Sequence, residues 1–279
     1  MPIHDQGYRR YKGSRAALGT AWQVITRAGV RSIVSKRVFI GLMLLAWAPF
    51  VARAVIIYVS SIYQQAAFLA PKGETFREFL DQQSAVVFFV TIYVGAGLIA
   101  NDRRANALQL YLSKPMTRAE YIAGKLAILF LFLTLVTWAP AICLLITQTL
   151  FAGSFTFIRN NLYLLPAITL FSLAQVLLAS TTMLALSSLS KSSRFVAVMY
   201  AGLFFFTTAL FQSLRGITGR SAFAWLSPGA ALEQLGDVIF RIRPRYDLPP
   251  AFAALAVIVL IVGSLWILER RVRGVEIVT

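Results

Sequence analysis

Six long apolar segments divide this 279-residue chain and limit what it can fold into. A helix needs about 20 apolar residues to cross the hydrocarbon core of a bilayer, and each segment approaches or exceeds that length. The second segment is short enough that it must extend into its flanks, and Pro140 predicts a kink in the third because proline removes a backbone donor. We expect an all-α polytopic membrane protein, with a cytoplasmic tail and interfacial helix at 1–37 and a six-span domain at 38–279. The expected spans cover approximately residues 38–61, 84–100, 122–150, 162–188, 195–213 and 250–268.

The distribution of basic residues predicts how these spans cross the membrane. The chain carries 27 Lys and Arg against 11 Asp and Glu, a formal net charge of +16. Eighteen of the basic residues flank the spans on the side of the N-terminal tail, and eight flank them on the other side. Because cytoplasmic loops are enriched in Lys and Arg, we expect a multi-pass membrane protein with both termini cytoplasmic. The apolar segments leave no soluble domain, so we do not expect this charge to bind nucleic acid.

The residue types that enzymes use are scarce in this chain. Cys143 is its only cysteine and His4 its only histidine, which excludes an internal disulfide, a Cys/His metal cluster and a Ser/His/Asp set within the spans. The only Gly-Lys pair, Gly124-Lys125, is followed by leucine and lacks the earlier glycine of a phosphate-binding loop. We therefore expect no enzyme activity and no catalytic, metal or cofactor-binding residues in this chain. The polar residues before the first span also predict that no signal peptide is cleaved.

Two segments outside the spans have the pattern of amphipathic helices. Residues 15–37 place apolar side chains near helical spacing and arginines largely away from them, which predicts a helix in the cytoplasmic interface or a simple basic tail helix. The long loop before the last span predicts one or two short helices, either dipping into the outer leaflet or packed on the surface of the bundle. The apolar face expected there consists of Leu232, Leu235, Val238 and Ile239.

The segment at 101–125 places basic residues and a proline between the second and third spans. Pro115 ends any helix before it, because proline lacks a donor and disfavours the α conformation at the preceding residue. Thr117 and Glu120 then have the spacing of a capping box, which predicts a new helix leading into the third span. We expect a short cytoplasmic helix, a corner and a rigid connection to the membrane; an ordinary amphipathic loop helix is the alternative. The apolar face of the short helix would carry Ala105, Leu108, Tyr111 and Leu112.

Arg53 is the one clear charge that the sequence places within a span. A charge at the centre of a bilayer costs about 2.5–3.5 kcal/mol on insertion scales, so Arg53 either has a function or extends to the outer headgroups. Gln175 in the fourth span and Gln148 near the end of the third are candidates for hydrogen bonds between helices. The acidic residues are expected in loops and tails, which argues against an intramembrane protease and a carboxylate-based proton-coupled carrier.

Short motifs follow a definite order along the chain. A run containing Leu108, Leu110 and Leu112 is followed by Ser113-Lys114-Pro115, Thr117-Arg118, Tyr121 and Gly124-Lys125. Leu226-Ser227-Pro228 precedes the last span, and the C-terminal stretch reads ERRVRGVEIV. This order, together with the six spans and the amphipathic segments, resembles the ABC-2 type permeases, the membrane subunits of ATP-driven ABC exporters. The resemblance covers nearly the whole chain, and it implies a location in a prokaryotic plasma (inner) membrane.

That resemblance implies a permease that expels a substrate while separate subunits hydrolyse ATP. It implies two ABC ATPase subunits, which bind ATP and magnesium, and a second permease protomer, either the same chain or a paralogue. The segment between the second and third spans would be the coupling helix, and the substrate path would lie between the protomers. The implied residues of the ATPase-coupling interface are Asp102, Arg103, Arg104, Leu108, Tyr111, Leu112, Lys114 and Pro115. The implied residues of the pathway or dimer interface are Arg53, Gln175, Phe204, Phe205 and Phe206.

Two other functions are compatible with the same spans and charges. One is a membrane scaffold or assembly factor that transports nothing, and the other is a carrier or channel that does not use ATP. The substrate class stays open as well, because lipids, glycans, peptides and drugs are all handled on one architecture.

Overall fold

The computed structural model describes residues 19–63, 65, 71–107, 116–152 and 156–272. Within these ranges the chain forms helices, turns and loops, and it contains no strand. The helices are α1 (Ala21–Val34), α2 (Arg37–Ile62), α3 (Gly73–Gly95), α4 (Ala100–Arg104), α6 (Arg118–Val136), α7 (Trp138–Phe151), α8 (Thr156–Asn160), α9 (Leu164–Leu189), α10 (Ser193–Thr218), the 3-10 helix η2 (Ala222–Leu226), α11 (Pro228–Ile239) and α12 (Pro250–Arg271).

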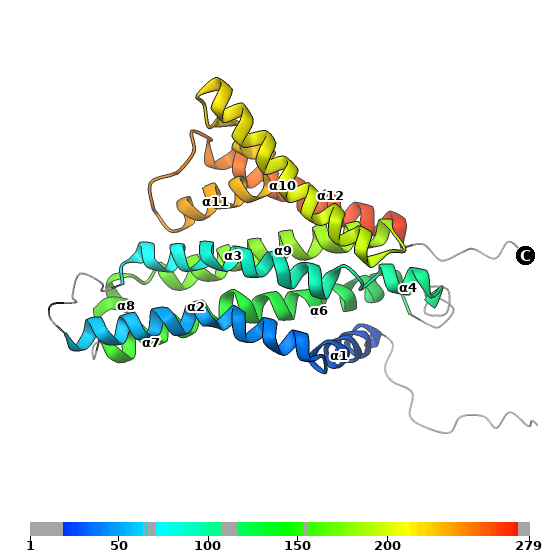
Figure 1. Cartoon of the computed structure of the whole chain (residues 1–279), viewed down its shortest axis with the longest axis horizontal. Coiled ribbons are helices and arrows are strands. Elements are labelled where there is room, and N and C mark those ends of the chain that lie inside the picture. Colours follow the sequence, from blue (N-terminus) through cyan, green and yellow to red (C-terminus); the bar gives the residue numbers. More distant parts are fainter. Residues whose placement is uncertain (1–18, 64, 66–70, 108–115, 153–155, 273–279) are drawn as a thin grey trace, which may run out of the picture.

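Six helices or helix pairs are long and apolar enough to cross a membrane, as the sequence predicted. They are α2, α3 continuing to α4, α6 continuing to α7, α9, α10 and α12. Figure 1 shows α2, α6 and α7 in one layer, α3 and α9 in the next, and α10, α11 and α12 in a third. Helices α1 and α4 and the end of α12 share one end of the bundle, here named the α4 end, and α8 marks the opposite α8 end.

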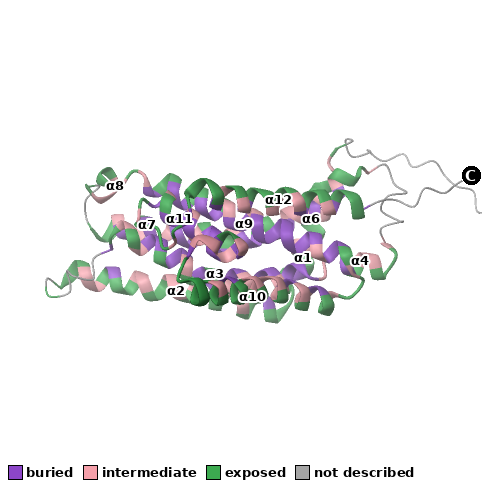
Figure 2. Ribbon diagram, turned by 90° about the horizontal axis from the view of Figure 1, so that it is seen from above, coloured by how far each residue is buried: buried purple, intermediate pink, exposed green. Residues whose placement is uncertain are grey.

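Helix α9 forms the centre of the bundle. Of its most apolar stretch, 61% is buried, and it packs against α3, α6 and α12. Helices α2 and α10 are the most exposed spans, with only 11% and 17% of the corresponding stretches buried. In Figure 2 the buried positions accordingly follow the middle of the bundle, whereas α10 is mostly exposed. The two spans with the largest uncovered apolar surfaces are therefore the first and the fifth.

The third span is broken between α6 and α7, as Pro140 predicted. Proline has no amide hydrogen to bond with the carbonyl four residues earlier, that of Val136. This carbonyl instead accepts a hydrogen bond of 3.1 Å from Nε2 of Gln83 in α3. The same nitrogen donates to the carbonyl of Ala46 at 2.9 Å, one turn from Pro49 of α2. The fully buried Gln83 thus joins three spans at the level of two prolines.

The second span begins earlier than the sequence predicted. Helix α3 starts at Gly73 rather than near residue 84, and its first turns include Glu74, Glu78 and Asp81. The expectation that all acidic residues fall in loops and tails was therefore wrong. The periodic apolar pattern begins only after these charged turns, so it did not predict that they belong to the helix. The charges are accommodated because basic side chains face them, as described below.

Helix α1 lies directly against α6. The oxygen Oγ1 of Thr26 donates to the carbonyl of Gly124 at 3.1 Å, and a Cβ atom added at Gly124 would lie 2.9 Å from Cβ of Ile25. A side chain at Gly29 would likewise meet Ile128. Glycines on both helices therefore permit the close approach. A helix within residues 15–37 is confirmed over Ala21–Val34, and its place in the membrane interface stays a prediction.

Two short helices, η2 and α11, precede the last span, as predicted. Their expected apolar face was wrong in part, because Val238 is exposed whereas Gln234 and Asp237 are buried. The side-chain nitrogen Nε2 of Gln234 donates to the carbonyls of Tyr246 and Leu248, at 3.0 and 2.7 Å. Backbone groups of the loop after α11 therefore satisfy a polar residue that periodicity alone would place outside. Figure 1 shows α11 between α10 and the α3–α9 layer.

Candidate functional site

The first candidate region is the pair of helix ends that carry the 108–115 segment. Asp102 in α4 forms a salt bridge with Lys125 of α6, with 2.7 Å between Oδ2 and Nζ. The hydroxyl of Tyr121 donates to the same carboxylate oxygen at 2.7 Å. Tyr121 is completely buried, and Lys125 nearly so. An ion pair withdrawn from water in this way fixes α4 to α6 on either side of the segment.

Helix α4 is also fixed to α9. The hydroxyl of Ser187 accepts hydrogen bonds from the amides of Ile99 and Ala100, at 3.1 and 3.0 Å, and donates to the carbonyl of Ala96 at 3.0 Å. Arg103 donates to the carbonyl of Ser188. These contacts satisfy the backbone groups left free where α3 ends and α4 begins. The entry to the 108–115 segment is therefore held by the most buried helix of the bundle.

The exit from the segment carries the predicted capping box. Oγ1 of Thr117 accepts from the amide of Glu120 at 3.2 Å, and Oε2 of Glu120 accepts from the amide of Thr117 at 2.8 Å. Arg104 is exposed at the end of α4, as a residue at the rim of an interface would be. The remaining predicted coupling residues, Leu108, Tyr111, Leu112, Lys114 and Pro115, lie outside the described residues.

The second candidate region is a buried ionic cluster that the sequence analysis missed. Arg77 lies within α3 and is 1% exposed, so Arg53 is not the one charge in a span. The Arg77 guanidinium pairs with Asp81 in the next turn and, at 3.2 Å from Nε, with Asp237 of α11. It also donates to the carbonyl of Glu233 at 3.0 Å and lies over the ring of Phe171. The spacing of four residues between Arg77 and Asp81 was the one available signal.

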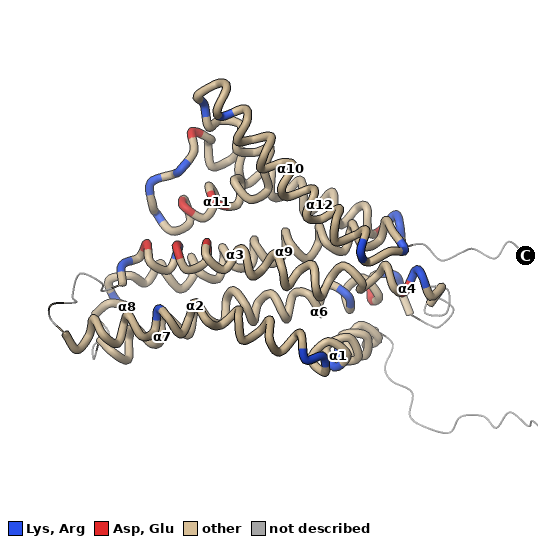
Figure 3. Tube along the Cα trace, viewed as in Figure 1, with Lys and Arg blue, Asp and Glu red and all other residues tan. Residues whose placement is uncertain are grey.

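Arg245, in the loop after α11, closes this cluster from the other side. Its guanidinium pairs with Asp81 and, at 3.2 Å, with Asp237. Burial raises the pKa of Asp237, and the neighbouring Arg77 and Arg245 only partly offset this effect. Burial lowers the pKa of Arg245, but the carboxylates of Asp81, Asp237 and Glu233 outweigh it and raise that pKa. Figure 3 shows the acidic positions of α3 and α11 facing each other near this basic loop.

A glycine permits the approach of Arg77 to α11. A Cβ atom at Gly236 would lie 2.6 Å from Nε of Arg77 and 2.6 Å from the ring of Phe171. At position 236, helix α11 therefore presents only backbone to the guanidinium, which lets Arg77 approach Asp237 and the carbonyl of Glu233. The cluster fastens α11 and the following loop to α3.

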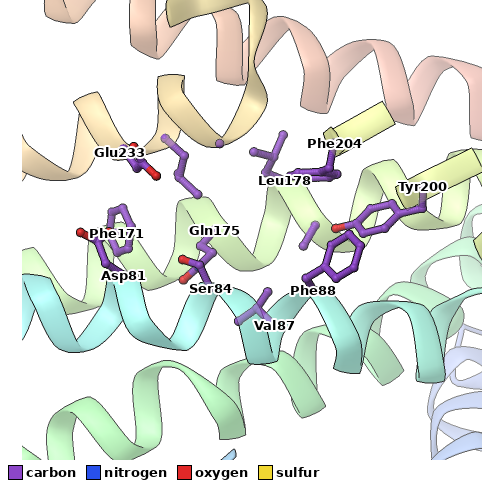
Figure 4. Close-up of a pocket in the computed structure, with 13 residues that line it drawn as sticks. Asp81, Ser84, Val87, Phe88, Phe171, Gln175, Leu178, Tyr200, Phe204 and Glu233 are labelled. Carbon is purple, nitrogen blue, oxygen red and sulfur yellow. The ribbon is translucent and has the colours of Figure 1, made fainter. Parts of the chain in front are cut away.

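A cavity of about 140 Å³ lies beside this cluster, between α3, α9, α10 and α11. Figure 4 shows Asp81 and Glu233 toward one side of it, Gln175 and Ser84 in the middle, and the rings of Phe88, Tyr200 and Phe204 toward the other. Gln175 is 4% exposed, and its Nε2 donates to the hydroxyl of Ser84 at 3.0 Å. Its Oε1 is buried and has no hydrogen-bond partner among the described residues.

The predicted pathway residues are not all brought together. Gln175 and Phe204 line this cavity, whereas Phe205 and Phe206 are about two-thirds exposed on α10. Arg53 lies on α2 and faces α3. Its Nη1 donates to the carbonyl of Thr75 at 3.1 Å and lies 3.9 Å from Glu78. These contacts join two spans, so Arg53 has partners within the protein.

Comparison with known proteins does not assign the chain to a family. No protein-family model matches it, and no curated protein matches it.

Proposed function

We propose that this chain is the permease subunit of an ATP-driven exporter of the ABC-2 type. It would form the substrate pathway together with a second permease protomer and bind two separate ATPase subunits through the segment between α4 and α6. The observation that carries the proposal is the double anchoring of that segment. Asp102 on the entry side is paired with Lys125 on the exit side, and both belong to helices fixed in the bundle.

Such anchoring suits an element that transmits force. A segment on a flexible loop would absorb a push from a docked partner, because loop conformations rearrange at little cost. Here the push would pass through the salt bridge to α6 and through Ser187 to α9, the central helix. Movement at the α4 end would therefore shift whole spans. The apolar face expected at Leu108, Tyr111 and Leu112 would supply the contact with the ATPase.

The exposed surfaces of α2 and α10 support a second protomer. Both are long apolar helices that the single chain leaves largely uncovered. Figure 2 shows them along the same side of the bundle, with α3 between them and α9. Packing two copies through this side would enclose a path between the chains and place Phe205 and Phe206 at the interface. Both termini would lie in the cytoplasm, as the basic residues predict.

Co-purification tests this proposal. The tagged full chain, extracted with mild detergents, should elute together with an ATPase of the phosphate-binding-loop type in a ratio near one to one. The complex should hydrolyse ATP, and chelation of magnesium should stop the reaction. Cross-linking in intact membranes before extraction controls for dissociation by detergent. Recovery of the chain without any ATPase after cross-linking would refute the proposal and favour a scaffold, or a carrier that does not use ATP.

A further inference from the structure

The cavity between α3, α9, α10 and α11 has the properties of a small-molecule site. Its volume of about 140 Å³ is close to that of an apolar cavity that holds benzene, roughly 150 Å³. Much of its wall is apolar, with the rings of Phe88, Phe171, Tyr200 and Phe204 among the lining residues. Apolar walls with a few placed polar groups are typical of ligand pockets.

The polar groups of this cavity are mainly hydrogen-bond acceptors. The described residues that line it include two carboxylates, Asp81 and Glu233, and no basic side chain. The buried Oε1 of Gln175 adds an acceptor that no described residue satisfies. A buried acceptor without a donor costs free energy, so a ligand that brings a donor gains by satisfying it. These groups select a ligand head that donates hydrogen bonds.

The charge around the cavity selects a cation. Asp81, Glu233 and Asp237 face two guanidinium groups, those of Arg77 and Arg245, which leaves this five-residue cluster with one negative charge. One aromatic ring of the cavity wall already contacts a cation, because the guanidinium carbon of Arg77 lies 4.5 Å from the centroid of Phe171. The faces of aromatic rings attract ammonium and guanidinium ions, and more strongly where water is excluded.

We propose that this cavity binds a primary ammonium ion attached to an apolar group about the size of a benzene ring. The ammonium would donate to Asp81, Glu233 and Gln175, and the apolar group would lie among Phe88 and Phe204. This site lies within one chain and does not depend on the proposed coupling to an ATPase. The primary ammonium ion is shared by free arylalkylamines, which also carry the apolar group, and by the ethanolamine headgroup of a phospholipid, which carries a phosphate instead.

Equilibrium dialysis with radiolabelled 2-phenylethylamine tests the proposal. The full chain is placed in nanodiscs of phosphatidylcholine at pH 7, and empty nanodiscs correct for partitioning into lipid. The amine should bind saturably. Because charge-assisted hydrogen bonds are stronger than neutral ones, 2-phenylethanol and 3-phenylpropanoate should compete at least about tenfold less well. No saturable binding, or equal competition by the alcohol, would overturn the proposal.

Substitutions locate the site. A Cβ atom at Gly229 meets only Oγ of Ser227, at 3.8 Å, so a side chain can begin there, and Gly229→Leu should fill the cavity and abolish binding. Gly216→Leu is the matched control, because Gly216 on α10 also has open space but does not line the cavity. Glu233→Gln should weaken binding of the amine about tenfold and leave competition by the alcohol unchanged. Full binding by the Gly229→Leu protein would overturn the assignment to this cavity.

Lipid composition distinguishes the two sources of the ligand. If nanodiscs containing phosphatidylethanolamine suppress binding of the amine to the unaltered chain, the headgroup is the natural occupant. If binding is unchanged in those nanodiscs, the site is for a free amine. Both results support an ammonium site and separate its two forms.

Discussion

A single buried arginine, Arg77, determines how α11 is held. Its guanidinium contacts acceptors on α3 and α11, and Gly236 leaves the space it needs. Burying a charge is costly unless it is paired and hydrogen-bonded, and removing one partner leaves the other charge uncompensated. Loss of Arg77 should therefore destabilise the protein more than loss of Asp237. Arg77 pairs with both Asp81 and Asp237, whereas the two arginines that pair with Asp237 also pair with Asp81 and would keep that partner.

Arg77→Leu should lower the free energy of unfolding by about 3 kcal/mol, since it leaves three carboxylates to Arg245 alone. Asp237→Asn should cost clearly less, because burial already raises the pKa of Asp237 and the remaining charges balance. The temperature at which the solubilised protein loses its monodisperse elution peak measures both effects. Equal losses of stability in the two variants would contradict the expectation that Arg77 contributes more to stability than Asp237.

At the scale of the helices, one glutamine compensates for the proline that breaks the third span. Pro140 breaks the third span and leaves the carbonyl of Val136 without its helix donor, and Gln83 of α3 donates to that carbonyl and to the carbonyl of Ala46, one turn from Pro49 in the continuous helix α2. Proline is tolerated in membrane helices where neighbouring side chains satisfy the freed backbone groups. Gln83 therefore acts as a structural polar residue in the middle of the bundle.

Gln83→Leu should destabilise the protein by about 2 kcal/mol, because it leaves the carbonyls of Ala46 and Val136 buried without this donor. Gln82→Leu is the matched control, since Gln82 is exposed on the same turn of α3 and should change stability little. Pro140→Ala supplies a backbone amide that can donate to the carbonyl of Val136. The loss of stability caused by Gln83→Leu should therefore be smaller in the Pro140→Ala protein. The same elution assay after heating measures all three. An equal loss in the proline-containing and alanine-containing proteins would contradict this role.

Local patterns predicted the parts of the fold that depend on sequence neighbours alone. Apolar length gave the six spans, Pro140 gave the break in the third, and Thr117 with Glu120 gave the start of α6. The charged turns at the start of α3 were not predictable in this way. Arg77 can be buried there because Asp81, Asp237 and the carbonyl of Glu233 accept from or pair with its guanidinium, and the last two are far away in the chain. The cavity likewise depends on how α10 and α11 meet α9, which no local pattern encodes.

For the whole molecule, the anchored segment at the α4 end and the cluster near the α8 end are joined through the same central helices. Helix α9 contacts α4 through Ser187 and α11 through Phe171 and its neighbours. Helix α3 runs from the ionic cluster to α4. A continuous series of contacts therefore links the α4 end to α11. The proposed exporter would require such continuity.

The most direct test of this account introduces a charge into the segment between α4 and α6. Leu112→Asp places a carboxylate on the predicted apolar face, so it should abolish association with the proposed ATPase subunit while the chain still inserts and elutes normally. Asn106→Asp introduces the same charge away from that face and should retain association, measured as the ratio of ATPase to permease after affinity purification. A Leu112→Asp protein that keeps its full complement of ATPase would contradict the central claim.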